Sequence, residues 1–496
     1  MTAATAYLPP ATGHPRPGRP PADVPATPRA PGPLRRYAPL LPALAVVALL
    51  AVPATPAGDG SAGSGTPADA ASGLLVLFCL VRVLRDRARP LTRTAALVLG
   101  LPVLGVSVAS ITSHDPAASL PGVARYLQIF VLVPAALLLL LRDRRDFRVV
   151  AGAVVVLGLG QGALGVVQYL TGTGASYRGE DIRAVGTFGA TDVMGMATVV
   201  AYALVVCVGY ALGEDRDVSG RLRAVALVCA GLLFFPLVLS FSRGAWIATA
   251  AALLVQLALS GVRRATRVVL AAAALGVVLV GGLGIGSQMI TERLSSITQV
   301  ADAPDQSVTD RYTMWAAATD MWRERPVTGV GLKGFPAYRD SHSSLALSAA
   351  SDTAGAGAGF QRQPLLSPHN MYLLVLSEQG LVGAVALVGS WAALLVCVLR
   401  RVPAARRSPA GAGPGLVVGG LLVWQVVDFG YADIGGPSTV LTALMLGLAA
   451  WWGLHRGAVP TDGRGPRDHR EPRRDPGPGD HRAPHHHRAN SGAAQA

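Results

Sequence analysis

The sequence of 496 residues is poor in charged residues, in aromatic residues and in cysteine. Only 15% of the residues are charged, whereas 51% are hydrophobic, and this balance excludes an ordinary soluble domain. The cysteines show no CxxC or Cys/His spacing, which argues against a disulfide framework and a zinc site; they are Cys79, Cys207, Cys229 and Cys397. We therefore expect no metal and no other cofactor.

What the sequence does contain is a succession of long apolar runs. A membrane-spanning helix needs about 20 mostly apolar residues, and about twelve such runs can be placed. They lie near residues 38–54, 70–84, 94–111, 122–141, 148–170, 190–212, 222–241, 244–260, 266–286, 370–399, 413–428 and 437–454. The predicted fold class is all-α, a polytopic transmembrane helix bundle.

The formal net charge of +14 is spread over alternate loops and is not gathered on one soluble face, so we predict no nucleic-acid partner. Arginines cluster at 35–36, 82–93, 142–148, 216–223, 263–267, 400–407 and after Arg456, and the intervening loops have few. By the positive-inside rule, this alternation predicts an even number of spans with both termini in the cytoplasm.

The chain divides by composition. Residues 1–34 and 457–496 are rich in proline and arginine and are predicted to be disordered cytoplasmic tails. Residues 35–286 hold the predicted spans 1–9, and residues 370–456 hold spans 10–12. The first apolar segment is interpreted as a retained anchor and not a secretory signal, because the basic region before it is long.

Residues 287–369 form the predicted extracytoplasmic loop domain, of roughly 80 residues between spans 9 and 10. Asp310 can cap a helix in which apolar residues recur at helical spacing, and Pro326 with Gly329 ends the run. We expect this amphipathic helix to lie against the membrane surface. The small, polar stretch 341–363 is interpreted as a mobile flap or an insertion.

Arginines on the predicted outer side are candidates for a functional role, since most basic residues are predicted to lie on the cytoplasmic side. Arg243 stands in the apolar run LVLSFSRGAWIATAA, at the outer turn between two predicted spans. A cation at that depth is costly unless it meets an anion or a water-filled cavity; otherwise it snorkels to lipid headgroups. Arg311 begins the loop helix, and Arg125, Arg178 and Arg183 are further outward candidates. Converging guanidinium groups would match a diphosphate.

The stretch SPHNMYLLVLSEQG (367–380) opens the tenth predicted span. Ser367 fits an N-cap and Pro368 the first helical position, which would place His369 and Asn370 in the first turn. The positive end of the helix dipole disfavours imidazolium, so His369 would stay neutral and able to accept a proton. The alternative is a surface histidine. Glu378 is predicted to face the bundle interior, more as a structural partner than as a catalyst.

Three stretches together resemble the O-antigen ligase and polymerase family: FSRGAWIA (241–248), DRYTMWAAATDMWRERPVTGVGLKGF (310–335) and SPHNMYLLVLSEQGLVG (367–383). Their order and the position of the large loop match this family. A fourth stretch, RAVGTFGATDVMGMA (183–197), resembles a segment of the family in which asparagine is common, but this chain has Asp192.

The resemblance implies a metal-independent, GT-C-like, inverting glycosyltransferase of the cytoplasmic membrane, active on its outer side. It would move a glycan from undecaprenyl pyrophosphate to an acceptor hydroxyl on a glycan, lipid or protein. Carried over by motif, Arg243 and Arg311 would hold the pyrophosphate and His369 would activate the acceptor. Asn370, Glu378, Arg183 and Asp192 are candidate supporting residues.

Two other classes of function stay open on the sequence alone. A secondary transporter or lipid-linked glycan flippase also suits about twelve spans, and charges within spans, such as Glu378 and Asp428, are typical of transport pathways. Against it, the two halves of the chain show no evident repeat. A scaffold for envelope assembly would need neither Arg243 nor His369.

Overall fold

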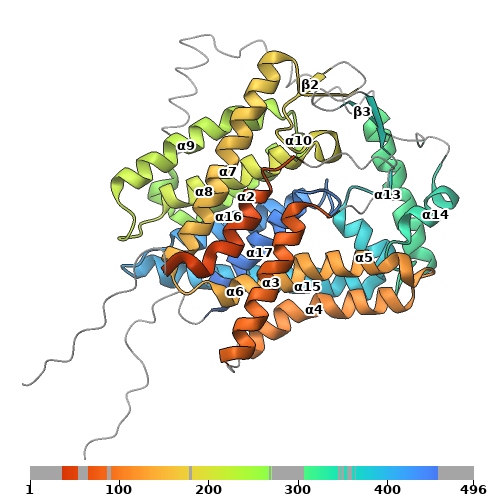
Figure 1. Ribbon diagram of the computed structural model, residues 1–496, viewed down its shortest axis with the longest axis horizontal. Helices are drawn as coiled ribbons and strands as arrows, with labels where there is room; N and C mark the ends of the chain where they lie inside the picture. Colours follow the sequence, from red (N-terminus) through yellow and green to blue (C-terminus); the bar gives the residue numbers. More distant parts are fainter. Residues whose placement is uncertain are drawn as a thin grey trace, which may run out of the picture.

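The computed structural model describes residues 36–53, 65–86, 91–177, 181–266, 270, 306–344, 347, 351–354, 360–363 and 365–455. The two predicted tails, Arg178, the start of the predicted loop domain and nearly all of the predicted ninth span at 266–286 lie outside these residues. The described part is a helix bundle, which confirms the predicted helical fold class (Figure 1).

Eight helical segments in the described part of the chain are long and apolar enough to cross a membrane. They comprise α3 (Pro67–Asp86), α4 (Arg93–Ile111), Ser119–Leu140 (within α5, Pro116–Leu127, through α6, Val133–Leu140), α7 (Arg144–Thr171), α8 (Gly195–Leu212), α9 (Gly220–Leu239), α10 (Arg243–Ser260) and α15 (Met371–Arg407). Shorter apolar helices are Ala38–Leu49, which includes α2 (Leu41–Leu49), α16 (Gly413–Asp428) and α17 (Thr439–Leu454). The total number of about twelve spans stays a prediction.

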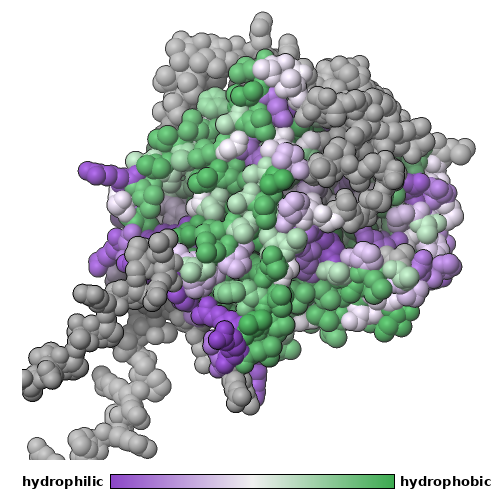
Figure 2. Space-filling model, viewed as in Figure 1, coloured by the Kyte–Doolittle hydropathy of each residue, from purple (hydrophilic) through white to green (hydrophobic). Residues whose placement is uncertain are grey.

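Helices that are apolar on all sides lie at the centre of the bundle, as expected for segments without a polar face. Every residue of α17 is buried, and in α16 the large side chain of Trp424 is fully enclosed. The outer helices instead expose apolar side chains, including Leu84 of α3 and Phe235 of α9. Figure 2 shows apolar residues over the outward face of α3 and α4, where lipid would contact the protein.

Two helices of the predicted loop domain lie at one end of the bundle: α13 (Gln306–Glu324) and α14 (Phe335–His342) (Figure 1). Met314 and Met321 of α13 are buried in a small apolar cluster that also contains Phe335 and Leu365. This face of α13 therefore packs on protein, and α13 has extensive contacts with α15.

A small antiparallel sheet of four strands adds to the helices, in the order β2-β1-β3-β4. The strands are β1 (Ala175–Tyr177), β2 (Asp181–Arg183), β3 (Ser351–Ala354) and β4 (Phe360–Gln363). Pairing of β1 with β3 joins the segment after α7 to the stretch 341–363. Sequence patterning did not reveal these strands, because each is only three or four residues long.

Arginine-rich loops meet at the other end of the helices. Arg144 donates a hydrogen bond of 2.9 Å to the carbonyl oxygen of Gly411, and Asp215 accepts one of 2.9 Å from the Gly413 amide. Arg401 donates to the carbonyl oxygen of His455 at 2.7 Å. These arginines belong to the arginine clusters that the sequence pattern predicts to be cytoplasmic.

Candidate functional site

The loop between α16 and α17, residues 429–438, is the meeting point of the segments that carry the candidate residues. The Met371 amide, at the start of α15, donates to the carbonyl oxygens of Phe429 at 2.9 Å and Ala432 at 3.0 Å. The Asn370 side chain donates to the Gly430 carbonyl oxygen at 3.1 Å. The start of α15 is therefore fixed to this loop.

His369 lies just outside the helix and not in its first turn, so the predicted helix start was wrong. The N-cap is Asn370, whose side-chain oxygen accepts a hydrogen bond of 3.0 Å from the Leu373 amide. Asparagine is among the strongest N-cap residues, which explains why the helix begins after it. His369 has a φ of 47°, a left-handed conformation that is incompatible with the helix and that turns the backbone at this point.

The His369 side chain reaches solvent, yet much protein surrounds it. The surrounding protein displaces water and so disfavours the charged imidazolium, which lowers the pKa of His369 below its usual value. The nearby charge of Arg311 acts in the same direction. The carboxylate of Asp433 opposes them and raises the pKa. The balance favours the neutral imidazole, the form that can accept a proton.

Asp433 lies in the 429–438 loop and holds the turn that carries His369. One carboxylate oxygen accepts a hydrogen bond from the Ser367 hydroxyl, and the other accepts one of 3.0 Å from the Gly435 amide. Sequence reasoning missed this residue. The signal available was the stretch FGYADIGGPS, a polar break between two apolar runs.

Arg311 reaches the same place from α13. Trp315 lies one helical turn further on, so its side chain shares a face with Arg311. The Trp315 indole N–H donates a hydrogen bond of 2.9 Å to the carbonyl oxygen of Pro368, directly before His369. Arg311 is half-buried and influences the pKa of His369, which places the two side chains in one electrostatic environment.

Arg243 is the first residue of α10, and its side chain is exposed. The Ser242 hydroxyl caps this helix by accepting a hydrogen bond of 3.2 Å from the Ala245 amide. Gly244 lies against Tyr431 of the 429–438 loop: a Cβ atom at this glycine would come within 3.3 Å of the Tyr431 Cβ. The start of α10 therefore adjoins the loop that also holds Asp433.

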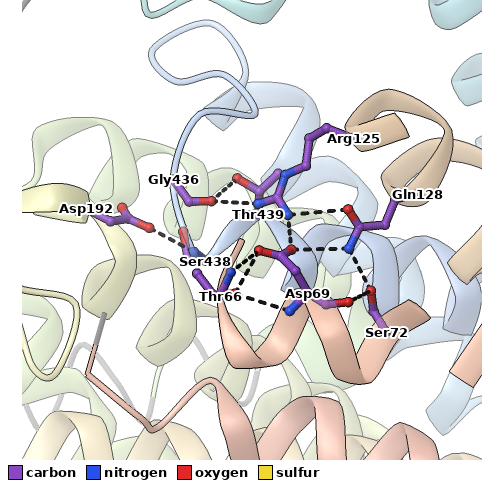
Figure 3. Close-up of polar contacts among 9 residues, drawn as sticks. All are labelled: Thr66, Asp69, Ser72, Arg125, Gln128, Asp192, Gly436, Ser438 and Thr439. Carbon is purple, nitrogen blue, oxygen red and sulfur yellow. Dashed lines mark hydrogen bonds and ion pairs between the residues drawn. The ribbon is translucent and has the colours of Figure 1, made fainter. Parts of the chain in front are cut away.

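Arg125 is engaged in an ion pair and a hydrogen-bond network. It forms a salt bridge with Asp69 of α3 and donates a hydrogen bond of 3.1 Å to the carbonyl oxygen of Gly436 (Figure 3). Gln128 donates to the same carboxylate at 3.2 Å. The network ties α3 and α5 to the 429–438 loop, so Arg125 has a structural partner.

Asp192 also contacts this loop, from the 3₁₀ turn η3 (Gly189–Asp192) before α8. Its carboxylate accepts a hydrogen bond of 2.9 Å from the Ser438 amide (Figure 3). Burial raises the pKa of Asp192, and the hydrogen bond from Ser438 acts against that rise. Arg183 is at the end of β2, next to Ala184, whose amide donates to the Leu239 carbonyl oxygen at 3.2 Å; these contacts place it beside the end of α9.

Glu378 is buried within α15, on the bundle side, in agreement with its predicted position. Its carboxylate accepts a hydrogen bond of 3.2 Å from the amide of Phe335, the first residue of α14. This contact gives Glu378 a structural partner outside its own helix.

Residues 226–388 match the family model described as O-antigen ligase. This region is similar to the O-antigen ligase family. The resemblance seen in the three sequence stretches is thus confirmed, and the matched region includes Arg243, Arg311 and His369 but not Asp433. It spans less than half of the chain, and no curated protein matches the sequence. The match to this family and the apolar helices support a role in polysaccharide biosynthesis for a multi-pass membrane protein.

Proposed function

We propose that the protein is a glycosyltransferase that moves a glycan from undecaprenyl pyrophosphate to an acceptor hydroxyl at the outer face of the cytoplasmic membrane. The observation that carries the proposal is the contact of Trp315 with the backbone before His369, which joins the Arg311 face of α13 to the histidine turn. Two guanidinium groups and a neutral imidazole match an anionic leaving group and a general base.

In the proposed reaction, Arg243 and Arg311 bind the pyrophosphate of the donor. A neutral His369 takes the proton of the acceptor hydroxyl as its oxygen attacks the anomeric carbon. The bond between that carbon and the phosphate oxygen breaks, and the polyprenyl pyrophosphate leaves with the electron pair. Attack on the side opposite the leaving group inverts the anomeric centre.

The arginines stabilise the negative charge that grows on the leaving pyrophosphate, and a preorganised charge of this kind is often the largest contribution to catalysis. Their fixed positive charge supports a mechanism without a metal ion. Asp433 contributes by holding the histidine turn through Ser367, and its negative charge stabilises the imidazolium that forms when His369 takes the proton.

The helix directions support the outward-facing assignment. The helices α10 and α15 both begin at the proposed site, and both run toward arginine-rich segments at 263–267 and 400–407. The proposed site thus lies at the end of the bundle opposite the positive loops. By the positive-inside rule, this end faces the outside.

The test is transfer by the purified protein, supplied with a polyprenyl-pyrophosphate oligosaccharide and an acceptor glycan. We expect His369→Ala to abolish transfer while donor binding persists, and Arg243→Ala to weaken donor binding. Arg263→Ala, just beyond the other end of α10, is the matched control and should leave both unchanged. Full transfer by His369→Ala would refute the proposed base. Passage of the donor across the vesicle membrane without a covalent product would instead favour the transporter or flippase alternative.

A further inference from the structure

The helix that follows His369 is broken nine residues after it begins. Gly380 has a φ of 62° and a ψ of −162°, so the helical conformation is interrupted between residues 371–379 and the rest of α15. In a continuous helix the amides of Leu381 and Val382 would donate to the carbonyl oxygens of Ser377 and Glu378. Unpaired backbone groups at this depth would cost several kcal/mol each.

A segment between α13 and α14 pairs with all four of these groups. Residues 326–331 (PVTGVG) lie against the break and supply two carbonyl oxygens and two amides in place of the missing helical partners. The hydrogen bonds are Leu381 amide to Pro326 oxygen at 2.9 Å, Val382 amide to Val327 oxygen at 3.2 Å, Val330 amide to Ser377 oxygen at 2.8 Å, and Gly331 amide to Glu378 oxygen at 3.0 Å. The segment therefore substitutes for one turn of hydrogen bonds.

This fit requires glycine on both sides of the contact. Gly329 has a φ of 68°, and a Cβ atom there would lie 2.5 Å from the Ser377 carbonyl oxygen. A Cβ atom on Gly380 would lie 2.3 Å from the Val327 carbonyl oxygen. Both separations are far below van der Waals contact, and both partners are backbone atoms that cannot move aside alone.

The residue directly after this segment, Leu332, is held by two further helices. The Leu332 amide donates to the Ala109 carbonyl oxygen of α4 at 3.1 Å, and the Ser119 hydroxyl of α5 donates to the Leu332 carbonyl oxygen at 2.8 Å. Glu378 fixes the next helix by accepting from the Phe335 amide. The segment is thus joined to α4, α5, α14 and both parts of α15.

We propose that residues 326–331 are a positioning element for the transfer site, with Gly329 as the residue on which their docking depends. The segment follows α13, which carries Arg311, and it pairs with residues 377–378, in the half-helix that follows His369. Docking therefore fixes α13 relative to the histidine turn. The inference rests on the proposed function for its catalytic consequence, but the docking itself can be measured without transfer.

The test compares Gly329→Ala with Gly389→Ala in a background from which the four native cysteines have been replaced. Gly389 is the matched control, because it lies in α15, the helix against which the segment docks, and a Cβ atom there meets no atom within 4 Å. Docking is followed by disulfide formation between Val327→Cys and Val382→Cys. In separate variants, the separation of nitroxide labels at the exposed positions Tyr312 and Leu366 reports α13 against the histidine turn.

We expect Gly329→Ala to lose the disulfide, to broaden the distance between the labels and to lower kcat/KM for the donor on the order of 100-fold, the scale expected for misplaced catalytic groups. Gly389→Ala should change none of the three. An unchanged label distance in Gly329→Ala after the disulfide is lost would overturn the proposal. The expected disulfide and distance results, in a protein that transfers no glycan, would refute the proposed function and leave the docking established.

A second pair of variants covers the case in which Gly329→Ala fails to fold. Glu378→Gln keeps an oxygen that can accept from the Phe335 amide, whereas Glu378→Ala removes it. We expect the glutamine variant to keep the disulfide and most of the transfer, and the alanine variant to lose both. Loss of transfer in Glu378→Gln with docking intact would give Glu378 a chemical role in place of the positional one.

Discussion

The indole N–H of Trp315 donates a hydrogen bond of 2.9 Å to the carbonyl oxygen of Pro368. This bond joins two segments that lie far apart in the sequence, the helix that bears Arg311 and the turn that bears His369, and both lie in the region similar to the O-antigen ligase family. The donor is a neutral side chain and the acceptor is backbone, so the contact can be removed without changing any charge in the proposed site.

Trp315→Phe should therefore weaken the alignment of Arg311 with His369 while most of the packing is kept. A hydrogen bond of this kind contributes about 1 kcal/mol, so we expect transfer to fall about fivefold. The measurement is kcat for glycan transfer, with Trp322→Phe as the control on the same helix. Equal effects of the two substitutions would show that Trp315 acts only through packing.

Replacement of Arg311 separates the effect of charge from that of geometry. Arg311→Ala should lower transfer on the order of 100-fold, as for loss of one preorganised donor to a developing negative charge. Arg311→Lys should recover only part, because an ammonium group cannot form the two parallel hydrogen bonds that a guanidinium offers to phosphate. Arg323→Lys, at the exposed end of α13, is the control, and full activity of Arg311→Lys would contradict bidentate binding.

The sequence predicted those features that depend on local pattern. Apolar runs located the helices, and the motifs FSRGAWIA and SPHNMYLL located Arg243 and His369 near the helix starts. The start of α15 was predicted three residues early because Ser367 and Pro368 also fit a capping pattern. Asn370 caps the helix through the Leu373 amide, and its tertiary contact with Gly430, which local pattern does not reveal, holds it there.

Features that depend on contacts between distant segments were not predictable in this way. Asp433 has no motif of its own, and its importance comes from Ser367, 66 residues away. Similarly, Gly329 was read only as the end of a helix, because nothing local shows that its backbone replaces a missing turn of α15. Each case is a backbone or side-chain contact that no periodicity in the sequence records.

The pH dependence of transfer should report the neutral state of His369. The protein around His369 displaces water, and this effect and the charge of Arg311 lower its pKa, so the rate should fall as the pH drops through this lowered pKa. Asp433 raises the pKa, so Asp433→Asn should lower it further and move the acid limb of the kcat/KM profile to lower pH. Arg311→Lys keeps the positive charge and should leave the limb in place. A shift of the Asp433→Asn limb to higher pH would contradict the assignment.

The ion pair of Arg125 with Asp69 should stabilise the bundle without taking part in transfer. Both side chains are about four-fifths buried, with exposed fractions of 21% and 18%, so removing one partner leaves a charge without compensation. We expect Arg125→Met or Asp69→Leu alone to cost about 3–5 kcal/mol, and the double variant to recover much of that loss because it leaves neither charge behind. Thermal unfolding in detergent measures this, and the residual transfer of the folded double variant measures the catalytic part. If the double variant instead lost as much stability as the two single variants together, Arg125 and Asp69 would act through separate partners. The hydrogen bond of Arg125 to Gly436 would then be the contact that holds the loop.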